Sequence, residues 1–191
     1  MALPAAPFPV APLPAAWFPI ARPLPDTTTL RRCGLSLRAA GDSDLAWLRT
    51  LFATIRTSVF AHVTWDGPSK SLFLDHQFLL QHQHFMTHHA GADFLVVRER
   101  NRAIGRLYVD RTQPTWRIVD IAIAPPHQHR GLGSTLLRWI QRAVARAGAD
   151  GVDLHVAHDN AGAARLYTAL GFVDAITAVP THRRMTWQAV R

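Results

Sequence analysis

The residues best suited to binding an anion form a glycine-rich segment in the second half of the chain. It lies between a β-type run at residues 119–123 and a helix-type run that begins at Ser134. Glycine lets the backbone turn tightly, and the free amides and dipole of a helix N-terminus attract phosphate. Two glycines alone fit an ordinary connection equally well. The segment consists of Gln128, His129, Arg130, Gly131, Leu132 and Gly133.

Two familiar phosphate-binding motifs do not fit this turn. A Walker turn ends in Gly-Lys-Ser or Gly-Lys-Thr, which this segment lacks. The dinucleotide fingerprint needs three glycines at another spacing, in a strand-helix-strand unit at the front of the domain. With these two motifs excluded, the remaining phosphate-binding interpretation is a pyrophosphate site of another type. In it, Arg130 adds charge and Ser134 adds a hydroxyl.

A second group of candidate residues follows downstream. A β-type run at residues 152–156 leads to Asn160, which begins a short helix that carries Tyr167. Side chains seven positions apart lie on nearly one helix face, roughly 10 Å apart along the axis, so one extended ligand could contact both. Plainer roles are a helix N-cap for Asn160 and a half-buried core aromatic for Tyr167.

Hydrophobic periodicity indicates the elements that position these residues. Apolar side chains at helical spacing predict helices within residues 45–55, 69–85, 134–147 and 160–170. Alternating or β-rich runs predict strands at residues 35–38, 94–98, 104–110, 116–123 and 152–156, and near Phe172 and Met185. Two helices, an antiparallel meander and then alternating helices and strands make an α/β (α+β) order.

The glycine turn, the helix and strand after it, Asn160 and the run Leu166-Tyr167-Thr168-Ala169-Leu170-Gly171-Phe172 occur in one order. This combination resembles the GNAT superfamily of N-acetyltransferases. The likeness is detailed over residues 118–172 and extends in element order from Leu35 to the C-terminus. It implies a mixed, splayed central sheet flanked by helices, with coenzyme A in a V-shaped gap between the strands that hold Ile121 and Leu154.

By position, the resemblance implies a set of residues that bind acetyl-coenzyme A. The backbone of Ile121, Ala122 and Ile123 is expected to pair with the pantetheine arm, and Asn160 to contact it. Tyr167 stands where family members commonly protonate the departing thiolate, a role that a phenol near the sulfur can fill. The pyrophosphate is expected at Gln128, His129, Arg130, Gly131, Leu132, Gly133 and Ser134.

The general base has two candidates. Some family members use a strand glutamate where this chain has His155, whose imidazole titrates near neutrality. Asp120, on the neighbouring strand, competes for the role. Each could instead only satisfy backbone groups or bound water beside the splay. We favour His155 over Asp120.

Composition bounds the class of protein. The chain has 191 residues, 48% of them apolar, which suits one catalytic domain, expected over residues 27–191. Cys33 is the single cysteine, which excludes an internal disulfide and a cysteine-based zinc site and fits a reducing cytoplasm. No metal is expected, because no carboxylate or cysteine evidently completes a site with the histidines in or after the second helix. These are His76, His82, His84, His88 and His89.

Residues 1–26 form a proline- and alanine-rich extension with almost no charge. Repeated proline forbids a continuous helix, and neither a secretory signal nor a membrane span fits the pattern. We expect extended or disordered chain here. An arm that lies on the domain or on a partner is an alternative.

The sequence therefore predicts an N-acetyltransferase that moves an acetyl group from acetyl-coenzyme A to a primary amine. Direct transfer in a ternary complex is expected, because no cysteine lies near the site. The acceptor, a small molecule or a protein amine, cannot be read, and a monomer or homodimer is expected. The alternative is an acyl-coenzyme A sensor with this fold and no turnover.

The formal net charge of +8 favours anionic partners and argues against polycationic acceptors. The arginines are nevertheless dispersed along the chain rather than gathered in a basic stripe, which disfavours nucleic-acid binding.

Overall fold

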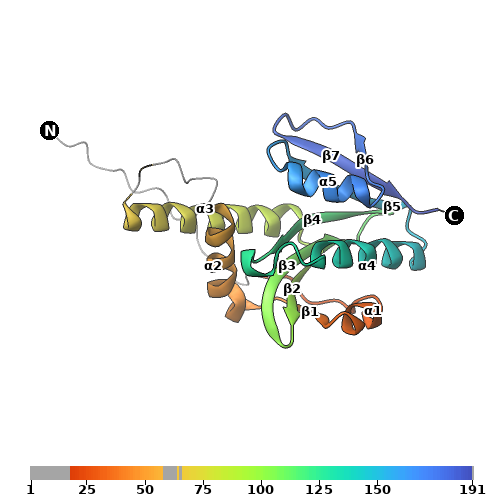
Figure 1. The fold of residues 1–191 in the computed structure, drawn as a ribbon, viewed down its shortest axis with the longest axis horizontal. Helices are drawn as coiled ribbons and strands as arrows, with labels where there is room; N and C mark the ends of the chain where they lie inside the picture. The colour runs from red at the N-terminus through yellow and green to blue at the C-terminus, as the bar shows by residue number, and fades with distance from the viewer. Residues whose placement is uncertain (1–17, 58–63, 65, 191) are drawn as a thin grey trace.

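The computed structural model describes residues 18–57, 64 and 66–190. Within them, a seven-stranded open sheet with the order β1-β2-β3-β4-β5-β7-β6 is flanked by helices (Figure 1). Neighbouring strands are antiparallel, except that β4 and β5 run parallel. The predicted fold class, a mixed sheet flanked by helices, is confirmed.

The predicted helices and strands all form, with ends shifted by a few residues, and a short additional helix, α1, precedes the first strand. In chain order the elements are α1 (Thr28–Arg32), β1 (Leu35–Ala39), η1 (Asp42–Asp44), α2 (Leu45–Arg56), α3 (Gly67–His88), β2 (Ala92–Glu99), β3 (Arg102–Asp110), β4 (Thr115–Ile123), η2 (Pro125–His127), α4 (Leu132–Arg146), β5 (Gly151–Ala157), α5 (Ala161–Ala169), β6 (Val173–Ala175) and β7 (His182–Gln188).

Strand periodicity divides the core between the two faces of the sheet. Side chains such as Val97, Leu107 and Leu154 pack in one cluster with α4 and α5. Phe94 and Val96, at alternate positions of β2, pack in a second cluster with residues of α2 and α3. Each face of the central strands is therefore held by a different pair of helices, as the period of two requires.

The sheet opens between β4 and β5. Their parallel pairing runs from Thr115 and Gly151 to Ile118 and Leu154 and stops there, although both strands continue. On the other side of β4, the register with β3 shifts so that Val119 is an extra, bulged residue. A bulge bends its strand and increases the local twist. The bulge is therefore the local feature that turns the end of β4 away from β5.

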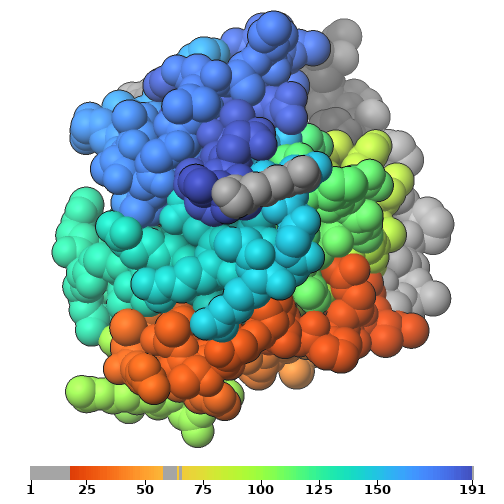
Figure 2. Space-filling model, turned by 90° about the vertical axis from the view of Figure 1, so that its right-hand side faces the viewer, coloured from red at the N-terminus to blue at the C-terminus, as the bar shows by residue number. Residues whose placement is uncertain are grey.

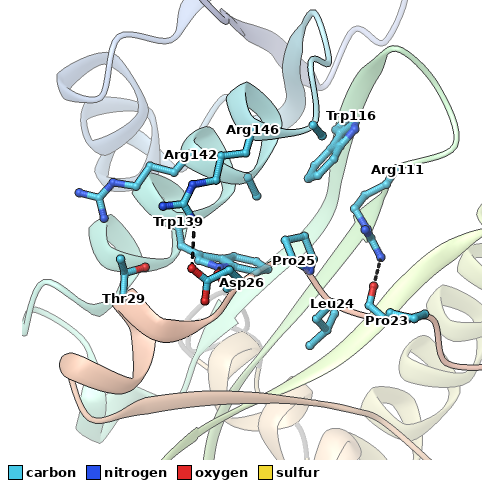
Figure 3. A pocket seen from close by; sticks show the side chains of 12 residues that line it. Pro23, Leu24, Pro25, Asp26, Thr29, Arg111, Trp116, Trp139, Arg142 and Arg146 are labelled. Atoms are coloured by element: carbon cyan, nitrogen blue, oxygen red, sulfur yellow. Dashed lines mark hydrogen bonds and ion pairs between the residues drawn. The ribbon is translucent and has the colours of Figure 1, made fainter.

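Residues 18–26 lie extended against the domain. The ring of Phe18 meets the rings of His82 and Phe94 edge-on, with centroids 5.0 and 6.0 Å apart. Farther along, the Trp139 indole donates to the carbonyl of Asp26 at 2.9 Å, and Arg146 pairs with the Asp26 carboxylate at 3.0 Å (Figure 3). The division of the chain at residue 26 stays a prediction, but this part of the extension contributes to packing.

On the molecular surface, the arm and α1 form a red-to-orange band beneath the teal helix α4 (Figure 2). A cavity of about 340 Å³ lies at this junction, with Trp116 and Trp139 among its lining residues. It is near the C-terminal end of α4, so it is separate from the glycine turn at the other end of that helix. No helix in the described part of the chain is both long and apolar enough to cross a membrane.

We predict that Phe18→Ala lowers the free energy of unfolding by about 2 kcal/mol, roughly half the loss for a fully buried phenylalanine. Ile20→Ala is the matched control on the same arm, because Ile20 is 95% exposed, and it should change stability by less than about 0.5 kcal/mol. Urea denaturation measures both values. Equal effects of the two substitutions would show that the ring contacts of Phe18 do not stabilise the fold.

Candidate functional site

The N-terminus of α4 is open to an anion. Gly131 precedes the helix with a φ of 73°, a left-handed conformation that glycine adopts without strain. The first helical hydrogen bond runs from the amide of Thr135 to the Gly131 carbonyl, at 3.0 Å. The amides of Leu132, Gly133 and Ser134 come before it and have no helical acceptor. The first turn also carries no acidic side chain, so its partial positive charge is unopposed.

Other residues of the turn brace the loop. The Gln128 side-chain amide donates to the carbonyl of Ile123 at 2.8 Å, and His129 is exposed with a φ of 58°. Both terminal nitrogens of Arg130 donate hydrogen bonds to the Glu99 carboxylate, at 2.8 and 3.0 Å. This guanidinium holds the pKa of Glu99 below its usual value. The charge of Arg130 is therefore already matched, and the free positive potential of the turn comes from the backbone.

The backbone of Ile121, Ala122 and Ile123 borders the gap in the sheet. On one edge these residues pair with β3, and their other edge lies beyond the last pairing of β4 with β5. Gly105 lies opposite on β3, and a Cβ there would come within 2.4 Å of the Ala122 carbonyl. The residues predicted to bind pantetheine therefore have one strand edge available.

Tyr167 lies on α5, and Asn160 is the N-cap residue of this helix. The Asn160 side-chain oxygen accepts from the amide of Ala163 at 3.1 Å, so it caps the helix. Tyr167 is 7% exposed, and its ring lies 5.7 Å from that of Phe172. Burial raises the pKa of Tyr167 to about 12, and the negative charge of Asp120 contributes. The phenol is therefore neutral at ordinary pH and keeps a proton to donate.

The two halves of the predicted site meet where α4 packs against α5. A Cβ on Gly133 would lie 3.3 Å from a methyl group of Leu166, the residue before Tyr167. The absence of a side chain at Gly133 thus lets the open end of α4 approach the helix that carries the phenol. The fold brings the glycine turn close to the candidate acid without any local sequence signal for this contact.

The two candidate bases differ in their surroundings. His155 is exposed on β5, and partial burial together with the charge of Arg117 lowers its pKa below the ordinary 6.5. Asp120 accepts a hydrogen bond from the buried Arg106 at 2.5 Å, and Arg106 also donates to Gln81. His155 is free to take a proton, whereas Asp120 already balances a buried charge.

Sequence reasoning missed Glu99 and Arg106, the partners of two predicted site residues. Glu99 is 31 positions from Arg130, and Arg106 is 14 positions from Asp120. The register of β3 with β4 brings Arg106 to Asp120, and the loop before α4 brings Arg130 to the end of β2. Both contacts depend on the tertiary fold, so no motif could have indicated them. In the described part of the chain, no group of three or more His, Cys, Asp or Glu side chains is arranged to hold a metal ion.

The fold resembles several solved N-acetyltransferases. PaiA N-acetyltransferase from Thermoplasma acidophilum, solved with coenzyme A, is 16% identical, with a TM-score of 0.62 over 81% of this chain and 98% of that one. Spermidine N-acetyltransferase from Vibrio cholerae, solved with coenzyme A and spermine, is 22% identical, with a TM-score of 0.58 over 82% and 96%. The ribosomal-protein-S18-alanine N-acetyltransferase from Escherichia coli is 18% identical, with a TM-score of 0.58 over 82% and 95%.

At these identities the structures establish the fold alone, and no curated protein matches the sequence directly. The family model described as "Acetyltransferase (GNAT) family" matches residues 58–172, which is more than half of the chain and includes both parts of the predicted site. The chain belongs to the GNAT family of acetyltransferases.

Proposed function

We propose that this protein is an N-acetyltransferase that moves an acetyl group from acetyl-coenzyme A to a primary amine, by direct transfer in a ternary complex. Acetyl-coenzyme A supplies the acetyl group as a thioester. The observation that carries the proposal is the uncapped N-terminus of α4 beside the gap between β4 and β5, with the neutral phenol of Tyr167 nearby on α5. Two of the similar structures were solved with coenzyme A.

The residues present suit this cofactor. The free amides of Leu132, Gly133 and Ser134 can bind the pyrophosphate, because they point along the helix axis and no acidic side chain competes. The open edge of β4 at residues 121–123 can pair with the amides of the pantetheine arm. Asn160 can contact the same arm through its side-chain nitrogen, since its oxygen already caps α5.

Two side chains can manage the protons. Tyr167 can donate to the departing sulfur, and a buried donor is most effective where charge develops. His155 can accept the proton of the incoming amine, because its lowered pKa leaves it neutral at pH 7. Asp120 is the alternative base, and its use would disturb the ion pair with Arg106. We infer a cytoplasmic location from the exposed free thiol of Cys33.

We predict that Gly131→Val reduces the rise in melting temperature that coenzyme A produces, because a β-branched residue cannot keep a φ of 73° without strain of about 1–2 kcal/mol. Gly148→Val is the control. Gly148 follows the other end of α4 with a φ of 65° and, like Gly131, has no atom within 4 Å of its added Cβ. Both variants should lose similar stability, but only Gly131→Val should lose the ligand-induced shift. A shift that survives in both would remove the turn from the cofactor site.

We predict that Tyr167→Phe lowers kcat by about 10²-fold while the affinity for coenzyme A hardly changes, since the lost hydroxyl acts mainly in the transition state. Tyr108→Phe is the matched control, because it removes the hydroxyl of a second buried tyrosine, which lies beside Arg106 on β3 and not on α5. Coenzyme A release and equilibrium binding give the two readouts. A sensor without turnover would release no coenzyme A in the wild type or in either variant. An unchanged kcat in an active Tyr167→Phe enzyme would exclude the phenol from the chemistry.

The pH dependence should identify the base. His155 acts only when unprotonated, so kcat/KM should stay high down to its pKa, below 6.5, and then fall as the pH is lowered. His155→Gln should be slow at every pH and lack this inflection. Asp120→Asn should instead destabilise the fold, because it leaves Arg106 buried without its counter-charge. If kcat/KM of His155→Gln still fell at the same low pH, the base would be a group other than His155.

A further inference from the structure

The gap between β4 and β5 opens on two different faces of the sheet. The face that carries Leu154 is covered by α4 and α5, the helices that hold the proposed cofactor site. His155 is the next residue along β5, so it points to the opposite face, where it is exposed. An amine that meets His155 and the acetyl group together must therefore approach from this second, polar face.

Two arginines border His155 on the polar face. Asp153, 2% exposed, accepts from Arg117 through both oxygens at 2.9 and 2.8 Å, and from Arg184 at 2.9 Å. Two guanidinium groups thus share one carboxylate. Their side chains are 40% and 37% exposed, so each keeps N–H donors toward solvent. Asp153 is saturated and cannot neutralise both.

Other carboxylates on this face do not compete for Arg184. Asp120 is paired with Arg106, and Asp110 accepts from Thr112. Asp110 lies on β3, and two strands separate it from Arg184 on β7. Its charge acts instead on the nearer Arg117, where it helps to raise the pKa. Of the two arginines that border His155, Arg184 therefore has the less opposing charge.

One cation and one anion that influence each other, Arg56 and Asp159, form no hydrogen bond or ion pair among the described residues. Arg56, at the end of α2, is half-buried, and its guanidinium lies over the ring of Phe52, 4.7 Å from the centroid. Asp159, on the loop after β5, is exposed and forms no ion pair with another described residue. Burial lowers the pKa of Arg56, and Asp159 lies near enough for its charge to oppose that shift. A polyamine needs several free carboxylates, and we identify one, Asp159, near Arg56 in the part of the chain that the structure describes.

We propose that the acceptor is a small primary amine that also carries an oxyanion, a carboxylate or a phosphate, which binds Arg184 with Arg117 beside it. This inference rests on the proposed acetyltransferase function. Arg184 is the cross-strand partner of His155. Such side chains start roughly 5 Å apart, so an amine at His155 and an oxyanion at Arg184 would be separated by about the length of an amino acid. A guanidinium binds either oxyanion as a planar fork.

The test compares acceptors that differ only in the anionic group. Coenzyme A release is measured with L-amino acids and their carboxamides, with O-phosphoethanolamine and ethanolamine, and with spermidine. For at least one anionic acceptor, kcat/KM should be about tenfold higher than for its neutral analogue, which is the scale of a charge-assisted hydrogen bond. The two series distinguish a carboxylate from a phosphate. Preference for neutral analogues or for spermidine would overturn the inference and leave the acetyltransferase function intact.

A matched pair of variants assigns the effect to Arg184. Arg184→Gln should raise KM for the anionic acceptor about tenfold, leave KM for its neutral analogue nearly unchanged and leave Asp153 paired with Arg117. Arg183→Gln removes the same charge one residue away, from a guanidinium that pairs with the exposed Asp174, and should change neither value. Equal effects of the two substitutions would reduce the preference to general electrostatics and overturn the assigned contact.

A binding measurement decides the inference even without turnover. If no amine in the panel releases coenzyme A, the acetyltransferase proposal fails as stated. The melting temperature of the coenzyme A-loaded protein is then compared with and without O-phosphoethanolamine or each amino acid. A rise that Arg184→Gln abolishes and Arg183→Gln retains supports the oxyanion site, and the absence of any rise overturns it.

Discussion

Pairing of β4 with β5 ends at Ile118 and Leu154, and the proposed site depends on this interruption. Two parallel strands that kept their ladder would satisfy each other's backbone groups and leave no edge for a ligand. The bulge at Val119 bends β4 while its ladder with β3 resumes at Asp120. Beyond the bulge, the gap is thus bordered by a strand that pairs with β3 on one side and does not pair with β5 on the other.

The helices α4 and α5 pack together so that both can contact one ligand in the gap. Leu132 and Leu136 of α4 and Tyr167 of α5 belong to the same buried cluster as the strands. Because the apolar face of α4 is fixed in this core, its open N-terminus is held in a constant direction. Gly133 allows the close contact with Leu166 that brings the phenol-bearing helix beside that end. The cofactor contacts are therefore a consequence of core packing.

The polar face is organised by buried charges. Asp153 and Arg106 are both buried, and each is neutralised by partners on neighbouring strands. Loss of one partner leaves an uncompensated charge in a poorly solvated place, which is strongly destabilising. These ion pairs hold the strands in register next to the gap. They also limit what a substitution can test, so Arg184, whose removal leaves Asp153 with Arg117, is the informative choice.

Sequence patterns predicted local features of the fold well. The apolar stripe of α4, the glycine turn and the cap at Asn160 each depend on neighbours within one or two helical turns, and they stand where the sequence indicates. The bulge at Val119 and the ion pairs of Asp153 depend on partners far along the chain. Proline content likewise forbids helix in the N-terminal extension, but it does not show that Phe18 packs on His82.

The pKa values constrain how the protons can move. A thiol in water has a pKa near 8.5, whereas burial raises the pKa of Tyr167 to about 12. Complete transfer of the Tyr167 proton to sulfur is therefore uphill, by about 5 kcal/mol if the thiol keeps its ordinary value. The phenol can still stabilise charge on the sulfur by donating a hydrogen bond without losing its proton. His155, once it has taken the proton of the amine, is the stronger acid of the two. The arrangement thus favours Tyr167 as a fixed donor and His155, or water, as the carrier of the proton that finally leaves the site.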